Sequence, residues 1–127
     1  MRNDKEEYKK EFIRRLIRLS VKTIEFSEVL KSRRILWSII DQLIRAITSI
    51  GANVVEAKSS SSRRDYIKFF EISLKSANEA KYWLMLVIET QKDDGIEKTA
   101  KVLLEETDEV SKIIGSSVLT LKGKNKF

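Results

Sequence analysis

The stretch DQLIRAITSIGANVVEAKSSSSRRDYIKFFEISLKSANEAKYWL, residues 41–84, decides the fold. It consists of two amphipathic segments that are separated by the serine run Ser59–Ser62. Ser62, with Asp65 three residues on, is typical of the first turn of a helix. Along the first segment and just before it, apolar residues alternate at spacings typical of a buried helix side: Leu36, Ile40, Leu43, Ile47, Ile50 and Val54. The stretch therefore predicts two neighbouring helices joined by a serine linker.

The flanking segments have the same helical periodicity. Before the stretch, a broad apolar face is predicted from Phe12, Leu16, Leu19 and Ile24, with Ile13 and Ile17 beside them. After it, KDDG at 92–95 predicts a turn, with Asp93 or Asp94 as the cap of a last helix. We expect helices over 4–30, from 32 or 33 to 58, over 63–91, and from 93 or 94 to 121.

The fold class that follows is all-α, an antiparallel up-down-up-down four-helix bundle. Residues 1–122 are predicted to form a single bundle domain, and 123–127 a flexible basic tail. Gly51 falls inside the second helix, where Ala46, Ser49 and Ala52 also keep the surface thin. Small side chains of this kind favour the close approach of a second helix.

Composition excludes several classes of chemistry. The chain has no cysteine and no histidine, so thiol nucleophiles, serine–histidine pairs and histidine metal sites are excluded. Phosphate-binding glycine motifs are absent as well. We therefore expect a protein that is not an enzyme, with no catalytic, cofactor-binding or metal-binding residues. No apolar run is long enough for a membrane span and the N-terminus is too charged for a signal peptide, so we expect a cytoplasmic location without membrane contact.

Positive charge is concentrated near the N-terminus. The net charge is +6, and residues 1–34 hold eleven Lys and Arg against six Asp and Glu, whereas 93–122 hold four against seven. A basic row at four-residue spacing predicts one continuous stripe on the first helix: Lys10, Arg14, Arg18 and Lys22, with Arg15 adjacent. Such a stripe can bind phosphates of RNA or DNA, can be a solvated face, or can pair with an acidic helix.

Polar residues lie unusually close to the predicted core seam: Arg45, Ser49, Asn53, Glu56, Asn78 and Glu79. Glu56 and Glu79 could approach each other as a carboxylate pair for acid–base chemistry. Without histidine, a hydrogen-bonded network across the two helices is the favoured interpretation. Two other features have a similar choice of interpretations. The serine linker with Arg63 and Arg64 could bind an anion or be a capped loop, and Tyr82 with Trp83 could stack on a base or pack in the core.

The order of these residues, in QLIRAITSIGANVVEA at 42–57 and RRDYIKFFEISLKSANEAKYWL at 63–84, resembles the 23S rRNA intervening sequence proteins, also called S23 ribosomal proteins. The resemblance extends from about Phe12 to Leu121, and the chain departs from it at Ser76 and Ala80, where relatives often have Glu and Thr. The resemblance implies a bundle that assembles into a ring, usually a homopentamer. A related branch is similar to the accessory protein of diversity-generating retroelements, which works with a reverse transcriptase and binds nucleic acid.

From residues and resemblance together, we expect a non-enzymatic oligomer that binds RNA or DNA through its basic surface. Its partners would be copies of itself, nucleic acid, and a reverse transcriptase or another protein. The alternative is a protein-interaction or scaffold ring without a nucleic-acid role. In that alternative the basic first helix docks on the acidic residues Glu105, Glu106, Asp108 and Glu109.

Overall fold

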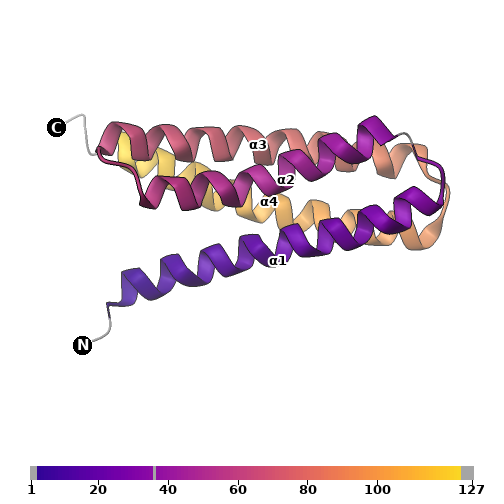
Figure 1. Ribbon diagram of the computed structural model, residues 1–127, viewed down its shortest axis with the longest axis horizontal. Coiled ribbons are helices and arrows are strands. Elements are labelled where there is room, and N and C mark those ends of the chain that lie inside the picture. The colour runs from indigo at the N-terminus through magenta and orange to yellow at the C-terminus, as the bar shows by residue number, and fades with distance from the viewer. Residues whose placement is uncertain (1–2, 36, 124–127) are drawn as a thin grey trace.

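The computed structural model describes residues 3–35 and 37–123. Within them the chain forms four helices, α1 (Asp4–Ser32), α2 (Trp37–Lys58), α3 (Arg63–Thr90) and α4 (Asp94–Gly123). Figure 1 shows the four helices side by side along one axis, with the N- and C-terminal ends of the chain at the same end of the bundle. The predicted all-α bundle is confirmed. Leu36 and the tail residues 124–127 lie outside the described residues.

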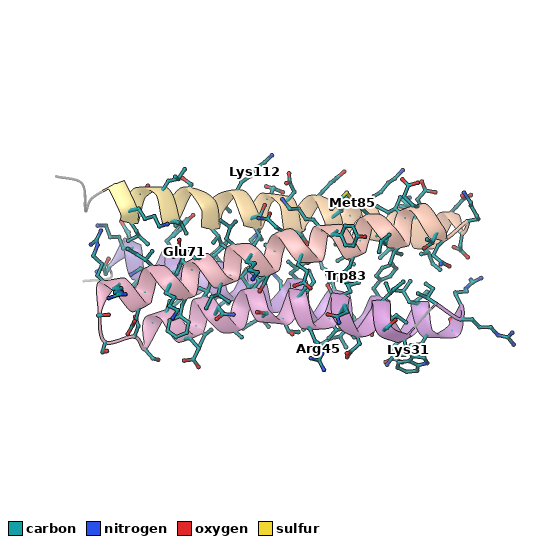
Figure 2. The ribbon with its side chains drawn as sticks, turned by 90° about the horizontal axis from the view of Figure 1, so that it is seen from above. Lys31, Arg45, Glu71, Trp83, Met85 and Lys112 are labelled. Carbon is teal, nitrogen blue, oxygen red and sulfur yellow. The ribbon has the colours of Figure 1, made fainter. Side chains whose placement is uncertain are left out.

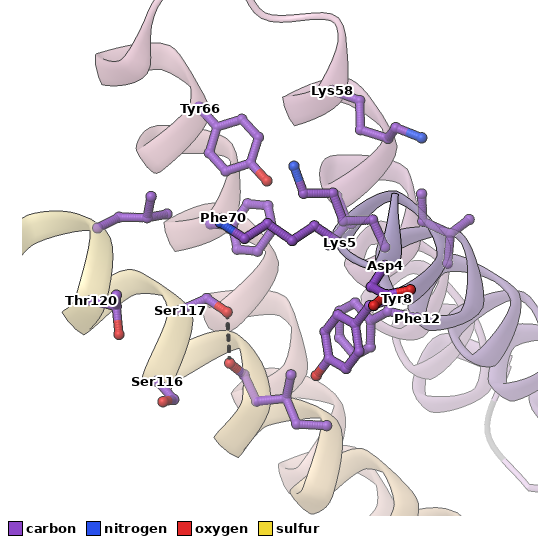
Figure 3. Close-up of a pocket in the computed structure, with 15 residues that line it drawn as sticks. Asp4, Lys5, Tyr8, Phe12, Lys58, Tyr66, Phe70, Ser116, Ser117 and Thr120 are labelled. Carbon is purple, nitrogen blue, oxygen red and sulfur yellow. Dashed lines mark hydrogen bonds between the residues drawn. The ribbon is translucent and has the colours of Figure 1, made fainter. Parts of the chain in front are cut away.

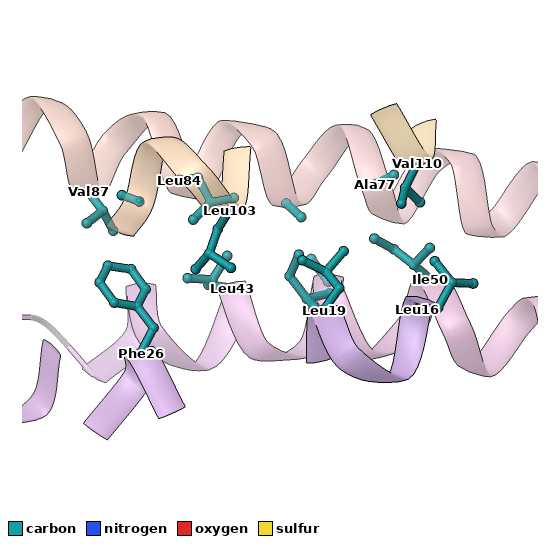
Figure 4. Packing of buried hydrophobic residues seen from close by; sticks show 14 of the residues in the cluster. Leu16, Leu19, Phe26, Leu43, Ile50, Ala77, Leu84, Val87, Leu103 and Val110 are labelled. Carbon is teal, nitrogen blue, oxygen red and sulfur yellow. The ribbon is translucent and has the colours of Figure 1, made fainter. Parts of the chain in front are cut away.

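One hydrophobic core runs between the four helices. The described members of the predicted α2 seam, from Ile40 to Val54, are at most 5% exposed. In Figure 4, Leu16, Leu19 and Phe26 of α1 lie across the core from α3 and α4. The last helix also has a heptad in the sequence, and in α4 the positions of this heptad up to Val118 are buried: Ile96, Ala100, Leu103, Thr107, Val110, Ile114 and Val118. The spacing of three and four residues between the apolar positions thus fixes which side of α2 and α4 faces inward.

Side-chain caps begin three of the helices. Asn3 accepts a hydrogen bond from the Lys5 amide at 2.9 Å, and Ser62 accepts one from the Asp65 amide at 3.1 Å. For α4 the cap is Asp93, whose Oδ1 accepts from the Ile96 amide at 3.1 Å. These contacts satisfy amide groups that have no partner inside the helix.

The second helix begins at Trp37, later than the predicted start at 32 or 33. The α1 helix ends in a Schellman turn, in which the amide of Ile35 donates to Leu30 O at 3.5 Å and that of Arg34 to Lys31 O at 3.3 Å. Arg34 adopts φ 60°, the left-handed conformation that glycine usually supplies at this point. Because an arginine occupies this position, the sequence has no glycine there that would have indicated the turn.

The predicted apolar face of α1 is wrong in part. Ile17 and Ile24 are 56% and 46% exposed, whereas Thr23 and Ser27 are buried. The two hydroxyl groups are accommodated because each donates to a backbone carbonyl of its own helix, Thr23 to Leu19 O and Ser27 to Ile24 O. The small residues of α2 allow the close approach of a second helix, as predicted, and this helix is α1: a Cβ added at Gly51 would lie 3.4 Å from Leu16 Cβ.

Candidate nucleic-acid interface

The predicted basic row is exposed along the outside of α1. Lys10, Arg14, Arg18 and Lys22 are all accessible to solvent. Glu11 lies among them and accepts hydrogen bonds from Arg14 at 3.1 Å and from Arg18 at 3.2 Å. These bonds, that from Arg18 first, hold the pKa of the Glu11 carboxyl below its ordinary value. The row therefore presents four cations with one carboxylate between them.

Arg15 has a different environment from the rest of the row. It donates from Nε to Glu106 Oε2 at 2.7 Å and from Nη2 to Oε1 at 2.8 Å, and it lies 3.5 Å from Glu109. Both groups of the main pair are about one-third exposed. The bond from Arg15 lowers the pKa of Glu106, and the same bond raises the pKa of Arg15. Arg15 therefore ties α1 to α4 within one chain, and the cations on the exposed face are the other four, of which Arg14 and Arg18 pair with Glu11.

The two flanks of α1 differ in character. Toward α2, a shallow groove of about 220 Å³ is lined by apolar and small residues, among them Ile17, Val21, Ala52 and Val55, and no charged residue lines it. Toward α4, Lys22 and Glu25 line a separate groove together with mostly apolar residues. The Lys22 and Arg18 charges also contribute to the lowered pKa of Glu106. One helix thus has an apolar flank toward α2 and a flank toward α4 that carries charges of both signs.

The polar motif near the α2–α3 seam forms a cross-helix network only in part. Ser49 Oγ lies 2.8 Å from Ser76 Oγ across the two helices, and Asn53 Nδ2 donates to Ser49 O and Oγ at 2.8 and 2.9 Å. Ser73, which the sequence analysis missed, donates across the same seam to Ile50 O at 2.8 Å. In the sequence, Ser73 lies between Phe70 and Ala77 in the apolar periodicity of α3, and this spacing could have indicated that Ser73 faces the core.

The other members of the motif do not join the helices. Arg45 pairs with Asp41 of its own helix at 3.1 Å, and Figure 2 shows it pointing away from the bundle. Glu79 accepts from the Trp83 indole of its own helix at 3.3 Å. Glu56 and Asn78 are exposed and form no hydrogen bond with another side chain of residues 3–35 and 37–123. The expected hydrogen bonds to Glu56 and Glu79 across the helices are wrong, because both carboxylates lie on the outer surface.

The two remaining candidate sites have their polar groups partly occupied. Ser62 Oγ is used as the α3 cap, and Arg63 donates to Leu121 O at the end of α4 at 3.0 Å. Tyr82 is 53% exposed and meets Trp83 edge to face, with ring centroids 5.3 Å apart. In the described part of the chain, no group of three or more acidic side chains could hold a metal ion. None of its helices is long and apolar enough to cross a membrane.

Comparison with known proteins identifies the family. The family model for 23S rRNA-intervening sequence proteins matches residues 8–116. The chain belongs to this family. No curated protein matches this intervening-sequence protein.

A solved structure supports the assignment. It is a protein of unknown function from the S23 ribosomal protein family of Bacteroides thetaiotaomicron, with 29% sequence identity and a TM-score of 0.77. The similarity covers 84% of the present chain and 97% of the Bacteroides chain. Of the two residues at which the resemblance was incomplete, Ser76 makes a cross-helix contact with Ser49, and Ala80 is fully buried.

Proposed function

We propose that this intervening-sequence protein is a non-enzymatic oligomer that binds RNA or DNA through the basic row of α1. The observation that carries the proposal is the exposed set Lys10, Arg14, Arg18 and Lys22, with Glu11 as the carboxylate among them. Cations along one exposed helix face bind phosphates without regard to base sequence, and each contact releases a counterion. The net charge of +6 favours the same class of partner.

Assembly of the protein is the second part of the proposal. Ile17, Val21 and Ile24 of α1, with Val55 of α2, leave an apolar surface exposed. A second copy that packs on this apolar surface would bury it and leave the basic row of α1 exposed. A ring, a homopentamer as the family resemblance implies, would repeat the basic row around one particle. Repetition strengthens binding because each further contact is then intramolecular.

Binding is tested with fluorescently labelled RNA and DNA at about 50 and 200 mM salt, where a phosphate-dominated complex weakens steeply. The double variant Arg18→Gln/Lys22→Gln should weaken binding and reduce the slope of log affinity against log salt by about one per lost contact. The matched control is Lys98→Gln/Lys101→Gln on α4, which removes the same charge and should leave the slope unchanged. Absence of binding at the lower salt would refute the proposal.

A scaffold ring is the second candidate. Arg15 pairs with Glu106 and Glu109 within one chain, and in the scaffold ring the exposed basic residues of α1 would pair in the same way with acidic α4 of a second copy. Neutralising Arg14 and Arg18 separates the two functions, with RNA binding and molar mass in solution as the two measurements. Loss of binding with assembly intact supports the first function, and loss of assembly supports the second. A mass equal to the 14.7 kDa monomer would refute both rings.

A further inference from the structure

A half-open cavity of about 590 Å³ lies at the end of the bundle where α1 begins and α4 ends. All four helices line it, and Figure 1 shows α1 diverging from the other three toward this end. Its volume falls within the range of roughly 300–1,000 Å³ that is usual for small-ligand pockets. Neither the sequence analysis nor the basic row of α1 accounts for it.

Aromatic side chains dominate one part of the cavity wall. Figure 3 shows Tyr8 and Phe12 of α1 on one side of the opening and Tyr66 and Phe70 of α3 on the other. The Tyr66 and Phe70 rings stack with centroids 5.0 Å apart and planes inclined by 17°. Tyr8 is 64% exposed, so that its ring is accessible to a ligand. Flat aromatic faces of this kind bind planar rings by stacking.

The rim of the cavity is cationic. Lys5, Lys9 and Lys58 line it, with Asp4 as the acidic member of the lining. The three ammonium groups form no ion pair with any residue in 3–35 and 37–123. In Figure 3 Lys5 lies between the start of α1 and Phe70, and the ammonium end of Lys58 is directed away from Tyr66. An anionic group at this position would therefore meet three ammonium groups against one carboxylate, that of Asp4.

Hydroxyl groups complete the lining on the α4 side. Ser116 and Thr120 are exposed there, and Ser117 donates to Ile113 O at 3.0 Å, which leaves its oxygen free to accept. These hydroxyl groups can form hydrogen bonds with nitrogen and oxygen atoms at the edge of a heterocycle. A purely aliphatic ligand has no such atoms. Stacking faces, edge-binding hydroxyls and a cationic rim together match a ring that carries an anionic substituent.

We propose that this cavity binds a nucleotide, with the base among Tyr8, Phe12 and Tyr66 and the phosphate on Lys5, Lys9 and Lys58. The site is separate from the basic row of α1. A free nucleotide would fill it whether or not the protein binds nucleic acid, and a nucleotide at the end of a single strand offers the same chemistry. The two sources are distinguished by the experiment.

The probes are adenosine 5′-monophosphate, adenosine, and ribose 5-phosphate, titrated by calorimetry against the intact protein. We expect the monophosphate to bind most tightly, because only it engages both the aromatic wall and the rim. Lys58→Gln should weaken it roughly three- to tenfold, the usual effect of one partly exposed charge-assisted contact. Lys75→Gln, which removes an exposed charge of α3 outside the cavity and outside the α1 row, is the matched control. Equal affinity for all three probes would overturn the proposal.

A cavity-filling variant gives an independent measurement. Ser116→Trp places a large side chain in the opening from an exposed position, and circular dichroism checks that the helices remain. It should abolish binding of the monophosphate, if the nucleotide is free, or weaken binding of a single-stranded oligonucleotide to the level that the α1 row alone supplies, if the nucleotide belongs to a strand. Binding of a blunt duplex reports only on the α1 row and should not change.

The outcomes separate this proposal from the proposed function. If neither the monophosphate nor the oligonucleotide responds to Ser116→Trp, the cavity proposal is overturned even when duplex binding persists. If duplexes do not bind but the monophosphate does, the α1 proposal alone fails. A change in molar mass caused by Ser116→Trp would show that the cavity is a contact with a second copy, which also overturns the nucleotide assignment.

Discussion

The pair formed by Arg15 and Glu106 should be the strongest single electrostatic contact between α1 and α4. Its geometry is bidentate, with distances of 2.7 and 2.8 Å, and the two side chains are 28% and 30% exposed. Fully exposed ion pairs contribute about 0.2–1 kcal/mol. Because this pair is bidentate and partly shielded from water, we expect a coupling free energy of about 1–1.5 kcal/mol.

A double-mutant cycle measures this coupling. Arg15→Gln, Glu106→Gln and the double variant are unfolded with urea at about pH 7, and the coupling is the non-additive part of the three losses in free energy of unfolding. Each single variant should also lower Tm by about 4–8 °C, given a loss of about 1 to 2 kcal/mol in a chain of this length. The exposed pair of Arg45 and Asp41 is the control, and its coupling should be about 0.3–0.5 kcal/mol.

The pH dependence of the coupling has a definite sign. The pKa of Glu106 in the folded protein is lowered from its ordinary value of 4.5, chiefly by the bond from Arg15. A carboxyl with a lowered folded pKa stabilises the fold above its unfolded pKa, and this stabilisation is lost as pH falls through the folded pKa. Arg15 stays protonated throughout, because its pKa is raised. The coupling should therefore be constant from neutral pH down to 4.5 and disappear below it.

Two results would refute this reasoning. A coupling no larger than that of the control pair at neutral pH would show that burial and bidentate geometry add nothing here. A coupling that persists after Glu106 is protonated would show that the measured energy comes from packing of the side chains rather than from charge.

Three further predictions concern the backbone and the helix ends, each measured by urea unfolding. Arg34→Gly should stabilise the protein by about 0.5–1 kcal/mol, because glycine adopts the left-handed backbone conformation without the steric strain of an arginine. An unchanged free energy of unfolding would show that Arg34 is not strained. Gly115→Ala should stabilise it by about 1 kcal/mol, because the added Cβ would lie in ordinary contact, 3.8 Å from Leu74 Cδ1. Asp93→Ala should destabilise it by about 1–2 kcal/mol, since the cap of α4 and the ion pair with Arg33 are both lost, and a neutral effect would exclude the cap.

The accuracy of the sequence analysis followed the strength of the local signals. The α2 and α4 seams and the Ser62 cap were predictable because each is encoded by neighbouring residues at fixed spacing. The start of α2 was not, because Arg34 takes the conformation that a glycine would have marked. The sequence predicted that a basic residue of α1 could pair with the acidic residues of α4. It did not predict that Arg15 pairs with Glu106, because the register of α1 against α4 depends on how the helices pack.

The error on α1 bears on how the protein assembles. The sequence analysis placed Ile17 and Ile24 inside the bundle because a wide apolar face on one helix indicates burial, yet both residues are on the outside of the single chain. Thr23 meanwhile occupies a core position. Exposed isoleucines in a contiguous patch are unfavourable for a monomer and typical of an interface. The apolar pattern of α1 is thus wider than the core of one chain requires, and a second copy on the flank toward α2 would account for the remainder.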